Sequence, residues 1–367
     1  MSTRLLERID RELAAAGDAA TRARLLQDRA VALTRLARND ESHEALAAAR
    51  REPQQALPEW LGLRFGYVAA IQTYFARRFA EATAQMREVL ARAREIGNAA
   101  LVAECESALA IFLQRDGDVR GAARHARAVL AGAEAGAESR YRAALALGSL
   151  LQDANEFDEA ARLFAQARAA VDEMGDDVAM ASLLHRTACL QAAQVRQAAA
   201  RGTLDPTAVR RAIGGLQTSI EFGAQAGEAP ARVLDELMLA EMLMLQERYA
   251  EALALYEANL ERAERDGRLV EVTVALADRA LCLLKIGRAD AALAAARAAQ
   301  ARLDDATPAE IRAIVHGNLA SVLGELGDAG QAREHAALAR IAWDAAAHEQ
   351  REARRLLAEA AATEDWR

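Results

Sequence analysis

The stretch LDELMLAEMLMLQERYAEALALYEANLERAERDG, residues 234–267, decides the fold. It predicts two helices joined by a tight turn at residues 246–248, because apolar residues recur at helical spacing and strong helix formers fill both halves. Ala240 in the first helix is expected to face Ala252 in the second. Two antiparallel helices need such small residues where their axes approach to about 8 Å. The stretch therefore predicts a helical hairpin.

The hairpin recurs along the chain with a step of about 40 residues. The position of Ala252 is filled elsewhere by Ala45, Ala82, Ala122, Ala160, Ala212, Ala292 and Ala332. Twelve residues before most of these alanines stands a second small residue: Ala70, Ala110, Gly148, Ala240, Ala280 and Ala320. Leu33 is the exception in the first unit, and the fifth unit matches at Ala188 once an insertion is allowed. One hairpin buries only one of its sides, so stacking of hairpins has to complete the core.

These residues resemble the tetratricopeptide repeat. RAALALGSLLQDANEFDEAARLFAQA, residues 142–167, carries Leu147, Gly148, Leu151, Phe157, Ala160, Phe164 and Ala167 at that family's spacing. The longer step is similar to the subgroup found in kinesin light chains and many bacterial regulators, which GNLASVLGELGD, residues 317–328, resembles most. The resemblance implies an all-α, right-handed α-solenoid of about eight such hairpins with terminal capping helices. In that subgroup an asparagine like Asn318 often holds a bound peptide's backbone, but the matching residues here are mostly Ala, Met or Asp.

The chain is expected to divide into an N-terminal capping helix at 1–19, a superhelix at 20–345, and a C-terminal helix and tail at 346–367. The expected turns lie near residues 40, 77, 117, 155, 195–207, 247, 287 and 327. The C-terminal helix is interpreted as a polar cap or as the start of a further domain downstream.

About 12 extra residues lie between Val195 and Thr207. The simplest account is three further turns on one helix, ending at Arg201–Gly202. Asp205 would then cap the next helix, with Pro206 at its first position. The protruding tip is interpreted either as an ordinary tolerated insertion or as a docking site.

Composition and charge exclude several classes of protein. The net charge is −8, with 46 basic and 54 acidic residues interspersed, so no footprint for a nucleic-acid backbone is visible. No apolar run approaches the ~20 residues that span a membrane. MSTRLLERIDREL at the N-terminus lacks the apolar stretch of a signal peptide. The three cysteines, Cys105, Cys189 and Cys282, are expected to be buried thiols, and the protein is expected to be cytoplasmic.

The chain carries no motif of a metalloprotease, a serine hydrolase or a phosphate-binding loop. We therefore expect no enzyme activity, no cofactor and no metal site. His185 and Cys189 stand at i, i+4 on one helix, a spacing that could hold a metal ion, although two ligands do not make a site. The alternative is that His185 is simply a polar residue of the groove.

The first helices of the hairpins are expected to line a concave groove. Six of the chain's aromatic residues fall between Trp60 and Phe79, out of 7 Phe, 5 Tyr and 3 Trp in all. Phe79 is expected in the core, and Phe65 and Phe75 between hairpins. The candidate groove residues are Trp60, Arg64, Tyr67, Ile71, Tyr74, Gln114, Arg115, Arg142, Gln152, His185, Glu241 and Lys285. Arg64 is suited to hold a carboxylate or a peptide backbone, and the aromatics either bind a partner or fill a narrow end of the superhelix.

The favoured function is a non-catalytic scaffold or adaptor that binds a protein or peptide segment in its groove. The alternative is the sensory or regulatory region of a bacterial signalling or transcription-regulating protein, for example upstream of a diguanylate cyclase domain. Neither nucleic acid nor membrane is expected as a partner, and a homodimer is left open.

Overall fold

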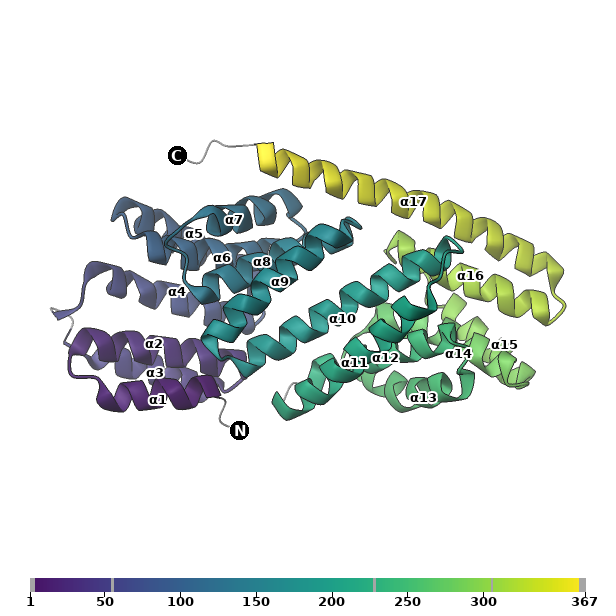
Figure 1. The fold of residues 1–367 in the computed structure, drawn as a ribbon, viewed down its shortest axis with the longest axis horizontal. Coiled ribbons are helices and arrows are strands. Elements are labelled where there is room, and N and C mark those ends of the chain that lie inside the picture. Colours follow the sequence, from purple (N-terminus) through teal and green to yellow (C-terminus); the bar gives the residue numbers. More distant parts are fainter. Residues whose placement is uncertain (1–3, 54–55, 227–228, 305, 363–367) are drawn as a thin grey trace. The chain divides into compact units, whose positions relative to one another are not determined.

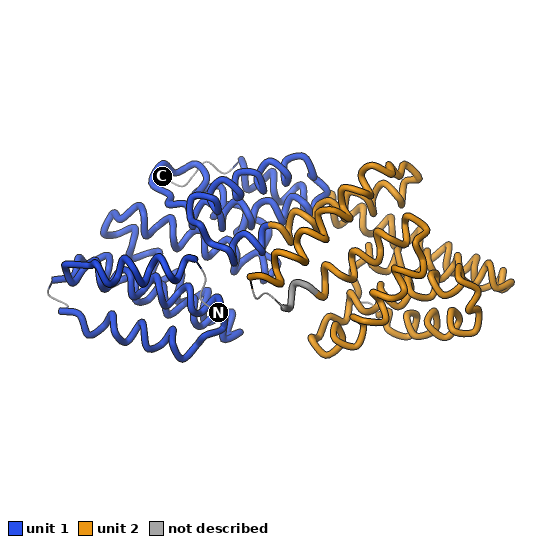
Figure 2. Tube along the Cα trace, turned by 60° about the horizontal axis from the view of Figure 1, so that its bottom comes forward, with its two compact units in different colours: residues 1–183, 353–367 blue, residues 184–352 orange. Residues whose placement is uncertain are grey.

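The computed structural model describes residues 4–53, 56–226, 229–304 and 306–362. Every regular element in these ranges is an α-helix, and no strand occurs in them (Figure 1). None of the described helices is both long and apolar enough to cross a lipid bilayer. The helices form two compact units, residues 1–183 with 353–367 and residues 184–352 (Figure 2). The expected all-α helical array is confirmed.

Unit 1 is built from consecutive helical hairpins. Its helices are α1 (Arg4–Ala15), α2 (Ala19–Arg35), α3 (Asn39–Arg51), α4 (Glu59–Phe75), α5 (Phe79–Glu95), α6 (Ala99–Arg115), α7 (Val119–Ala131), α8 (Ala137–Asp153) and α9 (Phe157–Met174). Within this unit α2 packs on α4, and α6 packs on α8, so the first helices of successive hairpins lie side by side.

Unit 2 continues the same pattern. Its helices are α11 (Pro206–Ala226), α12 (Ala229–Leu245), α13 (Tyr249–Arg265), α14 (Leu269–Lys285), α15 (Ala289–Gln300) and α16 (Ala309–Glu325). Two long helices have residues in both units, α10 (Asp177–Ala200) and α17 (Ala329–Ala362).

The hairpin turns share one backbone conformation. They lie at residues 36–38, 76–78, 116–118, 154–156, 246–248, 286–288 and 326–328. The middle residue of each turn has a positive φ, as in Ala37 (57°) and Gly287 (82°). The next amide then donates to the carbonyl five residues back, as Arg38 does to Leu33 at 3.0 Å. This Schellman arrangement satisfies the carbonyls at the helix end, which is how the chain stops one helix and starts the next within three residues.

The small residues of the repeat lie where the paired helices approach each other. Ala82, Ala122 and Ala252 are fully buried. At Gly148 the approach is closer still, because a Cβ there would lie only 2.6 Å from Cε1 of Phe164. The small-residue pattern in the sequence therefore marks true contacts between helix axes.

The insertion is shared between two helices. α10 has 24 residues and α11 has 21, against 17 in α12. The expected three extra turns on α10 were therefore wrong in extent: α10 gains about two turns and α11 about one. The expected start of α11 is confirmed, because Pro206 is its first residue and Oδ1 of Asp205 accepts a hydrogen bond from the amide of Thr207 at 2.8 Å.

The N-terminal helix α1 does more than cover one end of the array. Its Leu6 and Ile9 are buried in the core of unit 1. On the same helix Nη1 of Arg8 donates to the carbonyl of Met174 at 2.9 Å. Helix α1 therefore joins α2 to the end of α9 within unit 1.

The C-terminal segment differs from the expected separate helix beginning at residue 346. α17 runs from Ala329 to Ala362 without a break. The physical reason is that no proline and, after Gly330, no glycine interrupts it. Its residues from 353 onward belong to unit 1, where Nε of Arg354 donates to the carbonyl of Ala154 at 2.9 Å.

Candidate functional site

A buried arginine links helices on the inner face of unit 1, by which we mean the face formed by the first helices of its hairpins, α2, α4, α6 and α8. Nε of Arg64 on α4 donates to Oε2 of Glu104 on α6 at 2.8 Å, and Nη2 lies 2.7 Å from Oδ1 of Asp28 on α2. Its guanidinium also lies over the ring of Tyr67, 5.6 Å from the centroid. Burial opposes the charge of Arg64, but Glu104 and Asp28 outweigh this and raise its pKa. One cation thus joins the first helices of three hairpins.

A cavity of about 350 Å³ lies beside this arginine within unit 1. Its lining comes from α1, α2, α4, α6, α8 and the end of α9. The charged lining residues are Arg8, Glu12, Arg24, Asp28, Arg35, Arg64, Glu104, Glu134, Glu138 and Asp176. Apolar walls are supplied by Leu5, Ile9, Leu25, Val31 and Met174. This volume lies at the small end of the range for ligand sites in proteins.

A second arginine, Arg35, also lines the cavity. Nη1 of Arg35 donates to Oδ2 of Asp176 at 2.6 Å, and Glu138 lies 3.9 Å away. Asp176 is itself held in place, because its Oδ1 accepts the amides of Val178 and Ala179 at the start of α10. Glu104 and Glu138 also line the cavity, and their side chains are partly exposed. Burial raises the pKa of Glu104 in spite of its bond to Arg64.

Tyr67 does not lie open in the groove as the sequence suggested. Its side chain is only 1% exposed, and its hydroxyl accepts a hydrogen bond from Nη1 of Arg142 on α8. Nη2 of Arg142 also donates to Glu138 one turn away. Tyr67 is covered because the inner helices curl closely enough to bring residues 75 positions apart into contact. The neighbouring Ile71 is buried as well.

The other aromatics of this stretch form a cluster. Tyr74 is half-buried and stacks on Phe112 with ring centroids 4.2 Å apart. Phe79 packs edge-on against Tyr74. The guanidinium carbon of Arg115 lies over the ring of Phe79, 3.1 Å from the ring centroid. Phe75 was expected to wedge between hairpins, but its side chain is 47% exposed. The position of Phe75 at the last residue of α4, beside the turn, explains its exposure.

The remaining candidate residues of unit 1 lie at intermediate depth. Trp60, Gln114 and Gln152 are all half-buried. Among the described residues, Oε1 of Gln152 has no hydrogen-bond partner although it is buried. Contact between a ligand and any of these residues stays a prediction.

Inner helices of unit 2 are also joined by charged and polar pairs. Arg196 makes a two-pronged pair with Glu241, at 2.8 and 2.7 Å. The ammonium of Lys285 lies 2.6 Å from a carboxylate oxygen of Glu325, one repeat further on. Both Glu241 and Lys285 therefore have partners within the array.

Asn318 is engaged inside the array too. Its Nδ2 donates to Oδ1 of Asp278 at 2.5 Å, and the hydroxyl of Tyr256 donates to Oδ2 at 2.9 Å. Burial and the nearby Glu241 raise the pKa of Asp278 to about 7. In this arrangement Asn318 holds a neighbouring helix, whereas the family resemblance implied a role in holding a peptide.

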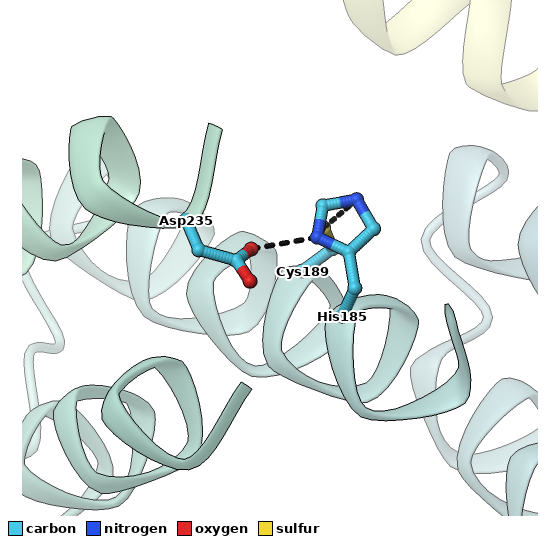
Figure 3. A group of neighbouring side chains, drawn as sticks. All are labelled: His185, Cys189 and Asp235. Atoms are coloured by element: carbon cyan, nitrogen blue, oxygen red, sulfur yellow. Dashed lines mark hydrogen bonds and ion pairs between the residues drawn. The ribbon is translucent and has the colours of Figure 1, made fainter. Parts of the chain in front are cut away.

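His185 meets a carboxylate that sequence spacing did not indicate. Its Nδ1 lies 2.6 Å from Oδ1 of Asp235 on α12, and Sγ of Cys189 lies 3.6 Å from its Nε2 (Figure 3). Oδ2 of Asp235 accepts from the hydroxyl of Ser219 on α11 at 2.5 Å. Burial lowers the pKa of His185, but its bonds to Asp235 and Cys189 outweigh this and raise it to about 10.

The candidate groove residues named from the sequence left out the acidic partners of Arg64, Lys285 and His185. One signal could have found some of them, namely an opposite charge or a polar complement one repeat step away. Arg64 with Glu104, Lys285 with Glu325 and Asp278 with Asn318 are all separated by 40 residues. Asp176 and Asp235 offer no such signal, because the chain distance to their partners follows no repeat.

Comparison with solved structures finds chains of similar fold. NprR in complex with its cognate peptide NprX is 12% identical, with a TM-score of 0.61 over 83% of this chain and 85% of that one. The apo form of the quorum sensor NprR from B. thuringiensis is 12% identical, with a TM-score of 0.59 over 79% and 80%. A Rap protein complexed with competence and sporulation factor is 13% identical, with a TM-score of 0.53 over 97% and 92%. No family model and no curated protein sequence matches the chain.

Proposed function

We propose that this chain, whose fold is that of the tetratricopeptide-repeat helical arrays, is a non-catalytic regulator or adaptor that binds a protein or peptide segment on the inner face of unit 1. The observation that carries the proposal is the cavity beside Arg64, which is walled by fixed charges and is large enough to receive a side chain or a chain terminus. One neighbour in fold was solved in complex with its cognate peptide, which supports a peptide as the ligand class.

The charges of the cavity favour a ligand with a basic group. Six carboxylates and four guanidinium groups line it. Arg64 is paired with both Asp28 and Glu104, Arg35 is paired with Asp176, and Glu138 accepts from Arg142, so the six carboxylates still outnumber the four guanidinium groups of the lining. The side chains of Glu104 and Glu138 are 29% and 39% exposed, and both line the cavity. A lysine, arginine or amino terminus of a peptide can form charge-assisted hydrogen bonds with these two groups.

Contacts within the protein fix the positions of the charged side chains around the cavity. Asp176 is fixed by two backbone amides, and Arg64 is fixed by two carboxylates and by the ring of Tyr67. Fixed partners lose little conformational entropy when a ligand arrives, which favours affinity. The rest of a bound segment would lie along the first helices of unit 1, past Trp60 and Gln114.

The test begins with a displayed peptide library selected on the full-length chain. Kd of an enriched peptide is then measured by fluorescence anisotropy for the wild type, Glu138→Gln and Glu104→Gln. Loss of a charged hydrogen bond costs about 1.5–3 kcal/mol, so each variant is expected to weaken binding by about 10–100-fold. Glu159→Gln on the exposed side of α9 is the matched control and is expected to bind as the wild type does.

Equal affinity of all four proteins for every enriched peptide would show that this face is not the binding site. A melting curve of each variant separates loss of binding from loss of folding. Enrichment of acidic peptides only would contradict the preference for a basic group.

A sensory role inside a larger signalling protein is the second candidate. The similarity in fold to a quorum sensor favours it. A reading frame that continues into an output domain, with an activity that the enriched peptide changes, would support this candidate over a simple adaptor. For either role we place the protein in the cytoplasm, where its three free thiols stay reduced.

A further inference from the structure

Three side chains that favour transition metals meet in unit 2, whereas the residues of the proposed peptide site belong to unit 1. His185 and Cys189 lie one turn apart on α10, and Asp235 comes from α12 (Figure 3). One potential ligand atom from each lies within 4.8 Å of the other two. Among the described residues this is the one group of three or more His, Cys, Asp and Glu side chains so arranged.

The distances are close to those of a tetrahedral zinc site. Zinc binds imidazole nitrogen, thiolate sulfur and carboxylate oxygen at about 2.0–2.3 Å, which places ligand atoms about 3.3–3.6 Å apart. Sγ of Cys189 lies 3.8 Å from Nδ1 and 3.6 Å from Nε2 of His185. Nδ1 of His185 and Oδ1 of Asp235 lie 2.6 Å apart, a hydrogen-bond distance that has to open by about 0.7 Å to admit the ion.

The surroundings supply the features that a metal site needs besides its ligands. Asp235 is 1% exposed, and its second oxygen is held by the hydroxyl of Ser219, which orients the carboxylate. His185 and Cys189 are only half-buried, so an ion and a fourth ligand from solvent have access. Cys105 and Cys282, by contrast, are fully buried.

We propose that Nδ1 of His185, the thiolate of Cys189 and Oδ1 of Asp235 bind one zinc-like divalent transition-metal ion, with water as the fourth ligand. The ion takes the place of the proton between His185 and Asp235. That proton and the thiol proton leave to solvent, so that two anionic ligands balance the charge of the ion. Sulfur, imidazole and carboxylate together favour zinc or cobalt over magnesium or calcium.

A bound ion would fasten α10 to the start of α12. It would thereby stabilise the native state of unit 2 by an amount that grows with the ratio of free metal to Kd. The three ligand residues belong to unit 2 and none of them lines the cavity of unit 1, so the test does not depend on the peptide proposal.

The test adds Co²⁺ alone to the full-length chain after treatment with a chelator. The expected result is one equivalent bound, with the near-ultraviolet thiolate charge-transfer band and the visible bands of tetrahedral Co²⁺. Zn²⁺ should displace the Co²⁺ and raise Tm. Cys189→Ser should lose the charge-transfer band, and His185→Gln should weaken binding by more than the ~10–100-fold typical of an outer partner. His43 is an exposed histidine on α3, and His43→Gln should leave the charge-transfer band and the Co²⁺ affinity unchanged.

Absence of the charge-transfer band from the wild type would overturn the proposal. So would its persistence in Cys189→Ser, because another thiol would then be the ligand. Tm of each variant without metal shows that the variant is folded. Should Cys189→Ser fail to fold, His185→Gln and Asp235→Asn decide the question, since unchanged Co²⁺ affinity in both contradicts the proposed ligands.

Discussion

Arg64 and Glu104 occupy equivalent positions of successive hairpins, 40 residues apart, and are joined by a hydrogen bond of 2.8 Å. The repeat therefore aligns opposite charges on adjacent first helices. Asp28 completes the group from the preceding hairpin. This is a polar complement to the small-residue packing inside each hairpin, because it links hairpins to each other.

Arg64→Met should strongly destabilise unit 1. The substitution leaves Glu104 and Asp28 without their shared cation, and breaking a buried ion pair costs about 3–5 kcal/mol. Denaturant unfolding of the full-length chain measures the change. Arg78→Ala is the control, because its pair with Glu81 is exposed and should contribute less than about 1 kcal/mol. A loss no larger than that of Arg78→Ala would mean that the buried group is solvated in solution.

Gly148→Ala should destabilise the chain although alanine is the better helix former. The new Cβ would meet Cε1 of Phe164 at 2.6 Å, and overpacking of this kind costs about 1–3 kcal/mol. Gly214→Ala is the matched control, since it is also within a helix and has open space around it, so it should gain up to about 1 kcal/mol. Phe164→Leu should relieve part of the clash in a double-variant cycle. Additive effects of the two substitutions would contradict the contact.

The hairpins could be predicted from the sequence because their determinants are local. Ala240 with Ala252, and Gly148 with Ala160, stand at a fixed spacing that follows from helix geometry and one short turn. The restart of the chain at Asp205 was predictable for the same reason, since capping involves neighbouring residues. The continuity of α17 also follows from the local sequence, because no helix-breaking residue occurs in it after Gly330.

The inner face was less predictable because its contacts depend on how closely the hairpins curl. Helical spacing placed Tyr67 on the inner side of α4, but only the approach of α8 covers it with Arg142. The same applies to Asp235, whose arrival beside His185 follows from the packing of α12 on α10. Contacts that do not follow the 40-residue step, such as Tyr67 with Arg142 and His185 with Asp235, leave no fixed spacing in the chain, so a periodic pattern cannot identify them.

A histidine pair should make stability fall in mild acid. Nδ1 of His316 on α16 lies 2.9 Å from Nδ1 of His335 on α17. Burial lowers the pKa of both rings, and His335 and Arg312 lower that of His316 further, whereas Glu334 opposes the shift at His335. As the pH is lowered, the unfolded chain therefore binds protons first, near pH 6.5. The free energy of unfolding has its highest value above that pH and decreases as the pH falls further.

The His316→Gln variant tests this dependence. Removing one ring should reduce the slope of the unfolding free energy between pH 7.5 and 5.5, where each proton contributes at most about 1.4 kcal/mol per pH unit. Ser321→Ala, an exposed residue on the same helix, should keep the wild-type slope. Identical slopes in all three proteins would show that the pair does not resist protonation.

Asp278 should have the opposite effect on the pH dependence. Burial and Glu241 raise its pKa from 3.8 to about 7, so between these values the native state holds a proton that the unfolded state has released. The free energy of unfolding therefore falls as pH rises through this window, by at most about 1.4 kcal/mol per pH unit. Asp278→Asn keeps an acceptor for Asn318 and should flatten that part of the curve, as urea unfolding at a series of pH values would measure. Tyr256→Phe removes one donor to the carboxylate but keeps the titrating group, so its slope should persist. A slope that Asp278→Asn leaves unchanged would mean that Asp278 is ionised in the native state throughout the window.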